Sequence, residues 1–268
     1  MSYMSLKILV LIKQVPDITK VKFDVEKGRI DRSSAEAEIN PFDLNALEAA
    51  VQIKERLGGS VLAISMGPPQ AVSALKDAIS RGADDAVLIE DKSFAGADTW
   101  ATSYTLAQAI KMIGKFDLIF CGEKTVDGDT GQVGAEVAEH LDIPHVYYVS
   151  KIKDATNDKI TLITEMDDAS YNVESGFPLL ISVTKDVNKP RLPILKEKLR
   201  AMKAEIKVWH ADDMLNVLDM TKVGYLGSPT AVNKIVVPKE KERKGKIFKS
   251  ADDAILVILE ALEKERLI

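Results

Sequence analysis

The sequence predicts an α/β protein with a doubly wound, mostly parallel sheet, an antiparallel extension of that sheet and a C-terminal arm. Apolar, β-branched runs alternate with amphipathic helical segments through the first half of the chain. Short strand-like runs separated by polar turns follow Pro144, and the chain beyond residue 210 contains a single apolar helix. With 268 residues, 46% of them hydrophobic, the chain can bury a large core.

The first elements are a buried strand and a capped helix. Leu6–Val15 is mostly apolar and ends at a Pro-Asp pair, which is typical of a strand buried on both faces of a parallel sheet. Val21–Ile30 is expected to form a hairpin. A helix follows, because Asn40 or Asp43 can cap it and apolar residues recur at helical spacing until the Gly-Gly pair at Gly58.

Three further strand–helix units repeat this order. The expected strands span residues 60–65, 86–89 and 117–121, and the expected helices span 70–81, 98–113 and 132–141. Four such units in a row predict a doubly wound sheet with right-handed crossover connections.

The pattern changes in the second half. Short strands are expected at 146–152, 159–165, 171–173 and 178–183, as an antiparallel extension of the sheet. A helix around 195–204 and the run 206–209 complete a nucleotide-binding α/β domain over residues 1–209. Residues 210–268 are loop-like, include a charge-dense run at 239–246, and end in a helix capped by Ser250. Such a tail cannot form its own core, so we expect this arm to pack on another subunit.

Composition excludes several classes of function. The net charge is −5 and the Lys and Arg residues are scattered, which argues against a nucleic-acid partner. Cys121 is the single cysteine, so we expect packing rather than thiolate chemistry and a reducing, cytoplasmic location. No apolar run is long enough to span a membrane. The three histidines have no metal-binding spacing and no nucleophile elbow is present, so no metal and no catalytic side chain is expected.

The loop from Gly122 to Gly134 is the most informative segment. It follows a strand, is rich in small residues and leads into a helix N-terminus, where backbone N–H groups and the helix dipole attract phosphate. It is neither a P-loop nor a Gly-x-Gly-x-x-Gly motif. A plain strand-to-helix turn is the alternative, since Asp127 and Asp129 weaken phosphate binding unless they point away, cap the helix, or hold a ribose or cation. The candidate residues are Gly122, Asp127, Gly128, Asp129, Thr130, Gly131, Gln132, Val133 and Gly134.

Other polar turns are expected at the same edge of the sheet. Lys13 follows the first strand, Ser65 and Gly67 follow the second, and Asn40 begins the first helix. Each turn taken singly is explained by turn and cap chemistry. Ligands of open α/β sheets bind at the carboxyl edge, however, so the convergence of these turns favours a binding site.

Taken together, several motifs resemble the β-subunits of electron-transfer flavoproteins. They occur in the order seen in that family and cover essentially the whole chain: Asn40-Pro-Phe-x4-Leu-Glu-x-Ala50, Ser65-x-Gly-Pro68, Arg81-Gly-Ala-Asp84, Asp127-Gly-Asp-Thr-Gly-Gln-x-Gly134, Lys189-Pro-Arg191 and Gly227-Ser-Pro229. The resemblance implies an adenine-nucleotide α-hydrolase-like fold and a heterodimer whose α-subunit carries FAD. Ordinary members hold AMP in the β-subunit, whereas electron-bifurcating members hold a second FAD there.

The resemblance also implies roles for the site residues. The loop is similar to that of the bifurcating branch, which implies an FAD-binding subunit of a complex that oxidises NADH and splits the electrons between two acceptors. In that interpretation Gly128, Thr130, Gln132, Val133 and Gly134 surround the pyrophosphate, and Asn40, Ser65 and Gly67 frame the ribose or adenine. A one-flavin shuttle with structural AMP is one alternative. An ATP-binding stress-type or ATP-cleaving protein is another, although the glycine-rich ATP loop and catalytic basic residues that it needs are not apparent.

Two regions concern the partners. The segment around Pro193 and Leu195 corresponds to a family loop that docks acyl-CoA-type dehydrogenases, and quinone- or ferredoxin-linked proteins are alternative partners; a leucine before a helix is otherwise usually core. The family signature departs at Glu165, which stands where an Arg is usual. Any partner contact made by that Arg is therefore in doubt.

Overall fold

The computed structural model describes residues 5–17, 22–24, 29–31, 37–231 and 245–268. The chain divides into two compact units, Met1–Ala231 and Val232–Ile268. This division lies later in the chain than the predicted boundary between residues 209 and 210. Among the described residues, no helix has the length and apolar character needed to cross a bilayer.

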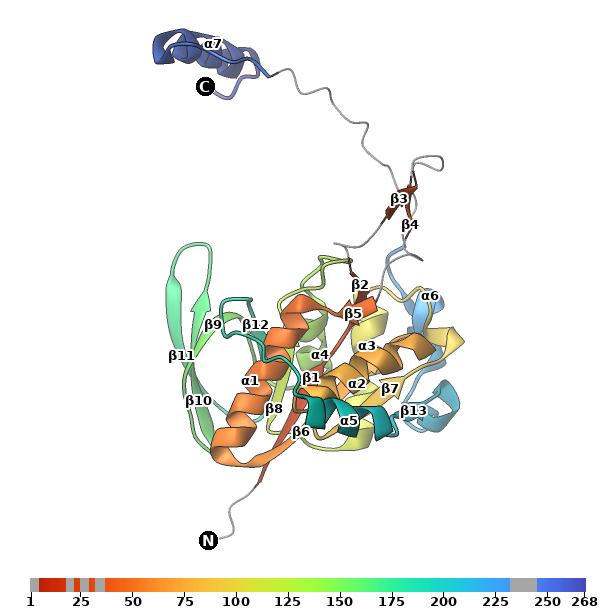
Figure 1. The fold of residues 1–268 in the computed structure, drawn as a ribbon. Coiled ribbons are helices and arrows are strands. Elements are labelled where there is room, and N and C mark those ends of the chain that lie inside the picture. Colours follow the sequence, from red (N-terminus) through yellow and green to blue (C-terminus); the bar gives the residue numbers. More distant parts are fainter. Residues whose placement is uncertain (1–4, 18–21, 25–28, 32–36, 232–244) are drawn as a thin grey trace. The chain divides into compact units, whose positions relative to one another are not determined.

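A nine-stranded sheet forms the centre of the first unit (Figure 1). Its order is β11-β10-β9-β12-β8-β1-β6-β7-β13, and the strands from β9 through β12 to β13 pair in parallel. The bounds are β1 Leu6–Leu11, β6 Gly59–Met66, β7 Asp85–Ile89, β8 Leu118–Gly122, β9 His145–Ala155, β10 Lys159–Glu165, β11 Ser170–Gly176, β12 Leu179–Val183 and β13 Lys207–Trp209. The predicted fold class is confirmed.

Helices cover both faces of the sheet. Successive side chains of a strand point to opposite faces, and those of the central strand β1 are apolar on both faces, so both faces must be covered. Ile8 and Val10 of β1 pack into a core under α1, α2 and α5, whereas Leu9 and Leu11 pack into a second core under α3 and α4 (Figure 1). The bounds are α1 Pro41–Leu57, α2 Val72–Ser80 after the short helix η2 Pro69–Ala71, α3 Thr99–Ile113 after η3 Lys92–Phe94, α4 Val133–Leu141 and α5 Leu195–Lys203.

Two strand predictions need correction. The strand predicted at 178–183 as part of the antiparallel extension is β12, Leu179–Val183, which lies between β9 and β8 and is parallel to both. All five of its residues are buried, which is the pattern of an interior parallel strand. The first strand also ends earlier than residue 15, because Gln14–Pro16 forms a separate strand, β2, that pairs with β5, Ala37–Ile39.

The predicted hairpin is present. β3, Lys22–Asp24, pairs antiparallel with β4, Arg29–Asp31. The turn residue Gly28 lies outside the described residues, as does most of the charge-dense run at 239–246.

The chain after residue 210 is more ordered than the predicted loop. It forms η4 Ala211–Met214, η5 Met220–Lys222 and α6 Gly224–Gly227, and it buries Met214 and Val223 in the core under α3 and α4. The apolar residues of this segment recur at neither helical nor strand spacing, so the sequence pattern did not predict that they are buried. In the second unit, Ser250 caps α7, Ala251–Lys264, as predicted, and none of the residues of this helix is buried.

Candidate nucleotide site

The candidate site lies where the direction of strand order reverses. β1 pairs with β8 on one side and with β6 on the other. After β1 the chain continues to β6 and β7 on one side, and after β8 it continues to β12 on the other side, so the gap between β1 and β8 is a topological switch point. Ligands of open α/β sheets bind in the crevice outside the carboxyl ends of the strands at this point. The loops after β1, β6 and β8 all start from that edge.

Two ion pairs neutralise Asp127 and Asp129, two of the acidic side chains of the loop after β8. Lys13 Nζ lies 2.7 Å from Asp127 Oδ1 and 2.8 Å from Asp127 Oδ2. Lys124 Nζ lies 2.8 Å from Asp129 Oδ1. Partial burial acts to raise the pKa of Asp127, but the hydrogen bonds and charge of Lys13 lower it below its ordinary value, so the carboxylate is ionised at neutral pH. The two carboxylates therefore do not present unpaired negative charge to a phosphate.

The end of this loop presents backbone amides. Asp129 and Gly131 have left-handed φ angles of 53° and 68°, and Gln132 returns to the right-handed region at φ −102°. A change of handedness between successive residues makes a concave group of N–H donors. Among the described residues, the N–H groups from Thr130 to Gly134 donate to no backbone carbonyl outside α4, and the N–H groups at the start of a helix have no acceptor within it. With the dipole of α4, these amides suit an anion.

Two glycines allow close packing beneath the loop. A Cβ atom at Gly134 would lie 2.6 Å from Cys121 Sγ and 2.6 Å from the hydroxyl oxygen of Tyr147. A Cβ atom at Gly122 would lie 2.6 Å from Asp43 Oδ1 and from the Cβ atom of Phe42. Gly128 differs, because its nearest contact would be Thr125 Oγ1 at 3.2 Å. A side chain is therefore excluded sterically at the first two positions, but not at Gly128.

Asn40 connects the two loops instead of pointing freely into the crevice. Its Nδ2 donates to the carbonyl of Lys124 over 2.9 Å, and its Oδ1 accepts from the N–H of Val126 at 3.1 Å. Its backbone N–H donates to the carbonyl of Lys13. The predicted contact of Asn40 with ribose or adenine stays a prediction.

Ser65 and Gly67 lie at the end of β6. The Ser65 side chain is 1% exposed, and its Oγ has no hydrogen-bond partner among the described residues. Gly67 donates its N–H to the carbonyl of Ile89 over 3.1 Å. A buried hydroxyl without a protein partner at the predicted site fits a nucleotide that carries hydrogen-bonding groups.

Two residues at the site had not been predicted. Tyr147 is partly buried, and its hydroxyl accepts from the N–H of Ala135 in the first turn of α4 at 2.8 Å. The sequence predicts Asn40 or Asp43 as the helix cap; Asn40 takes the N-cap position without a side-chain cap hydrogen bond. The Asp43 carboxylate instead accepts from the N–H groups of Lys13 and Gly122 at 2.8 and 3.1 Å. Both residues act through contacts between segments that are far apart in the sequence, and no local sequence pattern predicts such contacts.

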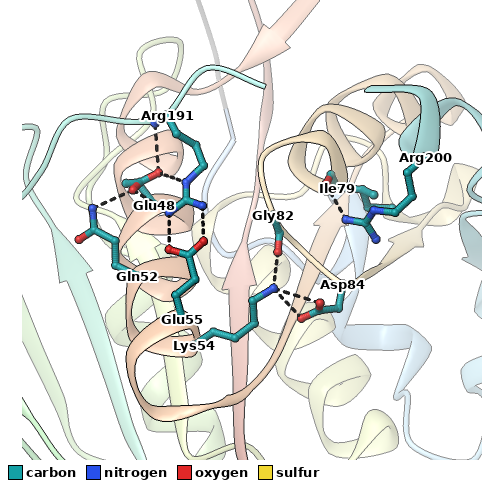
Figure 2. Close-up of polar contacts among 9 residues, drawn as sticks. All are labelled: Glu48, Gln52, Lys54, Glu55, Ile79, Gly82, Asp84, Arg191 and Arg200. Carbon is teal, nitrogen blue, oxygen red and sulfur yellow. Dashed lines mark hydrogen bonds and ion pairs between the residues drawn. The ribbon is translucent and has the colours of Figure 1, made fainter. Parts of the chain in front are cut away.

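The predicted partner-binding segment is exposed and held at both ends (Figure 2). Arg191 Nε donates to Glu48 Oε2 over 2.8 Å and Arg191 Nη1 to Glu55 Oε1 over 2.6 Å. Arg200 Nη2 donates to the carbonyl of Ile79 over 3.0 Å. Between these two arginines, the exposed fractions are 83% for Leu192, 62% for Ile194 and 73% for Leu195, with Pro193 among them. In this chain the segment is an apolar protrusion and not part of the core.

The Arg191 ion pairs make a testable contribution to stability. Replacing Arg191 with Met leaves the carboxylate of Glu48, a residue only 5% exposed, without its cation, and we expect a loss of about 2–3 kcal/mol in the free energy of unfolding. Burial acts to raise the pKa of Glu48, but the hydrogen bonds from Arg191 lower it below its ordinary value of 4.5. This stabilisation is therefore present above about pH 4.5 and is lost as the pH falls through the lowered pKa.

Urea unfolding at neutral and acidic pH measures this effect. The matched control is Lys159→Ala, which removes a pair with Glu174 in which both side chains are half exposed, and it should cost less than about 0.5 kcal/mol. Equal losses for the two variants would contradict the prediction.

Glu165 makes local hydrogen bonds at the rim of an open cavity. It accepts from Ser150 Oγ at 2.9 Å and from the hydroxyl of Ser170. The hydrogen bonds from Ser170 and Ser150 lower its pKa. The cavity has a volume of about 900 Å³ and is lined by His145, Val146, Tyr147, Tyr148, Thr164, Glu165, Met166, Asp167, Asp168, Tyr171 and Val173.

Comparison with known proteins supplies the family. A model of the electron transfer flavoprotein domain matches residues 27–214. This chain belongs to the electron transfer flavoprotein family. The electron transfer flavoprotein subunit beta of Clostridium acetobutylicum is 41% identical over 98% of this chain and 100% of that protein. The subunit of the same name from Thermoanaerobacterium thermosaccharolyticum is 42% identical over 98% of this chain and 100% of that protein.

A third relative is subunit CarD of the caffeyl-CoA reductase-Etf complex of Acetobacterium woodii, 40% identical over 88% of this chain and 89% of that protein. The resemblance to β-subunits inferred from the motifs is confirmed, and with it electron transfer as the role of the chain beside an α-subunit. The match extends over nearly the whole length, so the C-terminal arm belongs to the family pattern too.

Proposed function

We propose that this chain holds FAD at the switch point of its sheet, and that with an FAD-carrying α-subunit it forms a cytoplasmic, electron-bifurcating complex. The complex oxidises NADH and splits the electrons between two acceptors. One observation carries the proposal: the loop after β8 turns left-handed at Asp129 and Gly131 and leads directly into the N-terminus of α4, a backbone arrangement that suits an anion.

The residues of the chain would bind and orient the cofactor. The amides of the loop would hold the pyrophosphate, and the Ser65 hydroxyl would hydrogen-bond the nucleoside part. Lys13 pairs with Asp127 and so offsets the negative charge that this carboxylate would present to the phosphates. The flavin supplies the electron chemistry when it is bound, while the surrounding dipoles and charges tune its potential.

AMP is the alternative occupant, because the ADP part of FAD and AMP share adenine, ribose and a phosphate next to the ribose. Two facts favour FAD and bifurcation. The Asp127–Gly134 loop resembles that of the bifurcating branch. One relative of similar length is named as a subunit of a complex with a reductase.

Counting the nucleotides tests the proposal. The chain is co-purified with its α-subunit, and the nucleotides released by denaturation are separated and quantified. Two FAD per heterodimer, with NADH oxidation that requires two acceptors together, support bifurcation. One FAD and one AMP per heterodimer would instead indicate the one-flavin shuttle. ATP turnover without bound flavin would contradict both the bifurcating complex and the shuttle.

The exposed segment after Arg191 is proposed to bind the redox partner, an acyl-CoA-type dehydrogenase or a quinone- or ferredoxin-linked protein. Leu195 is 73% exposed next to Pro193, and an apolar side chain that enters a partner pocket contributes strongly to affinity. Leu195→Glu is therefore expected to weaken partner binding about 100-fold, with the flavin content unchanged.

Leu215, 56% exposed in a different segment, provides the matched control. Leu215→Glu should leave the dissociation constant, measured by surface plasmon resonance with the intact heterodimer, within about threefold of the wild-type value. Similar dissociation constants for the Leu195 variant and the wild type would contradict the docking role.

A further inference from the structure

The N-terminus of α1, from its N-cap Asn40 to Asp43 in its first turn, contacts both loops of the candidate site. The Asp43 carboxylate accepts from the N–H of Lys13 through Oδ2 at 2.8 Å and from the N–H of Gly122 through Oδ1 at 3.1 Å. Asn40 adds hydrogen bonds to Lys13, Lys124 and Val126. One short turn therefore hydrogen-bonds to the backbone of the segments that follow β1 and β8.

The carboxylate lies where the two strands separate. The parallel ladder between β1 and β8 ends with the pair Val10 and Phe120. Beyond it, Ile12 donates its N–H to Ile64 of β6 instead. Asp43 thus binds the next donors of both strands, and Gly122 has no room for a side chain because the carboxylate and Phe42 are so close. Asp43 therefore joins the ends of the two strands directly, beside the Asn40 hydrogen bonds and the Lys13–Asp127 ion pair that also connect the loops.

We infer that Asp43 is a positioning residue for nucleotide binding: its two carboxylate oxygens hold the Lys13 loop and the 122–134 loop at the separation at which the amides reach the phosphates. The inference rests on the proposed function and assigns a role to a residue that is 5% exposed. Pre-formed donors bind more tightly because less ordering is needed on binding.

Protonation should weaken this arrangement. Burial raises the pKa of Asp43 to about 7, although the hydrogen bonds from Lys13, Asn40 and Gly122 and the charge of Lys13 act to lower it. Cys121 lies in β8 with its side chain in the core under α3 and α4, on the other face of the sheet. Burial and the charge of Asp43 raise the pKa of its thiol to about 12, so it stays neutral. An ionised carboxylate accepts from both N–H groups, whereas a protonated one offers a single good acceptor.

The experiment compares Asp43→Asn with Asp117→Asn in the heterodimer. Asp117 is the matched control, because its carboxylate accepts from the N–H of Lys7 at 2.8 Å and so connects the same two strands at their amino ends. The probe is AMP, titrated into heterodimer from which the β-subunit nucleotide has been removed. The dissociation constant is measured at about pH 8.5 and about pH 5.5, on either side of the titration of Asp43.

We expect Asp43→Asn to weaken AMP binding about tenfold or more at the higher pH, and less than about twofold at the lower pH, where the wild-type carboxyl also accepts only one hydrogen bond. The AMP phosphate also titrates between these pH values, but it affects both proteins equally, so the ratio of the variant and wild-type dissociation constants reports the effect of Asp43 alone. Asp117→Asn should stay close to the wild type at both pH values. A ratio that does not change with pH, or tighter binding by the Asp43 variant, overturns the inference.

Amide hydrogen exchange without nucleotide separates this inference from the proposed function. Asp43→Asn should speed exchange in residues 12–17 and 122–134, and Asp117→Asn should not. If the wild type binds neither AMP nor FAD, the proposed function fails together with the role of Asp43 in binding. If the wild type binds AMP and both variants behave like it, only the role of Asp43 is overturned.

Discussion

Replacing Gly134 with Val is expected to remove the nucleotide from this chain while the FAD of the α-subunit is retained. A Cβ atom there would lie 2.6 Å from both Cys121 Sγ and the Tyr147 hydroxyl oxygen, and neither is the end of a long flexible side chain. The first turn of α4 must therefore move away from the sheet, which displaces the amides that we assign to the phosphates. We expect nucleotide affinity to fall by about 100-fold or more, with an overpacking cost of about 1–3 kcal/mol in stability.

The control lies outside the loop. Gly176 ends β11, and a Cβ atom there would meet only the carbonyl oxygen of Asp158, at 3.6 Å. Gly176→Ala should therefore change nucleotide affinity by less than about threefold. Chromatography of the nucleotides released from each heterodimer measures both results. Full retention of the β-subunit nucleotide by the Gly134 variant would remove the loop from the proposed site.

Deletion of residues 232–268 is expected to release the α-subunit. Helix α7 has no buried residue, and its exposed apolar side chains include Ile255, Leu256, Ile258 and Leu259. A helix with such a face requires a surface to cover it. We expect the dissociation constant of the heterodimer to rise at least about 100-fold, measured by analytical ultracentrifugation.

The position of the cut decides whether this result can be interpreted. A deletion from residue 210 would remove Met214 and Val223 from the core under α3 and α4, whereas a deletion after Ala231 leaves the first unit complete. A second variant, with Ile255, Ile258 and Leu259 changed to Ser in the full-length chain, should reproduce the loss of binding. An intact heterodimer in both cases would show that the arm does not hold the partner.

The fold was largely predictable because its signals are local. The β1 run is apolar at almost every position, and Gly58 and Gly82 end helices by adopting left-handed φ angles of 81° and 119°. Strand order is not local. Leu179–Val183 pairs with β8, more than fifty residues earlier in the chain, and nothing in a run of five apolar residues specifies that partner.

The candidate site was predictable as a place, but not as a set of contacts. The convergence of polar turns on one edge follows from the parallel topology. The ion pair of Lys13 with Asp127 joins residues 114 positions apart, and the hydrogen bond of Asp43 to Gly122 joins residues 79 positions apart. Asp43 has the residue type of an ordinary helix cap, but it lies in the first turn of α1 and its carboxylate binds the two loops instead, which becomes visible only once α1 is packed on the sheet.

The two outer strands of the sheet have a consequence for solubility at high concentration. A long apolar border strand with unpaired backbone groups invites another chain to add to it and begin aggregation. At one border, β13 has only three residues and begins with Lys207; at the other, β11 carries Glu174 and is mostly polar and exposed. Extension of the sheet from one molecule to the next is thereby discouraged at both borders.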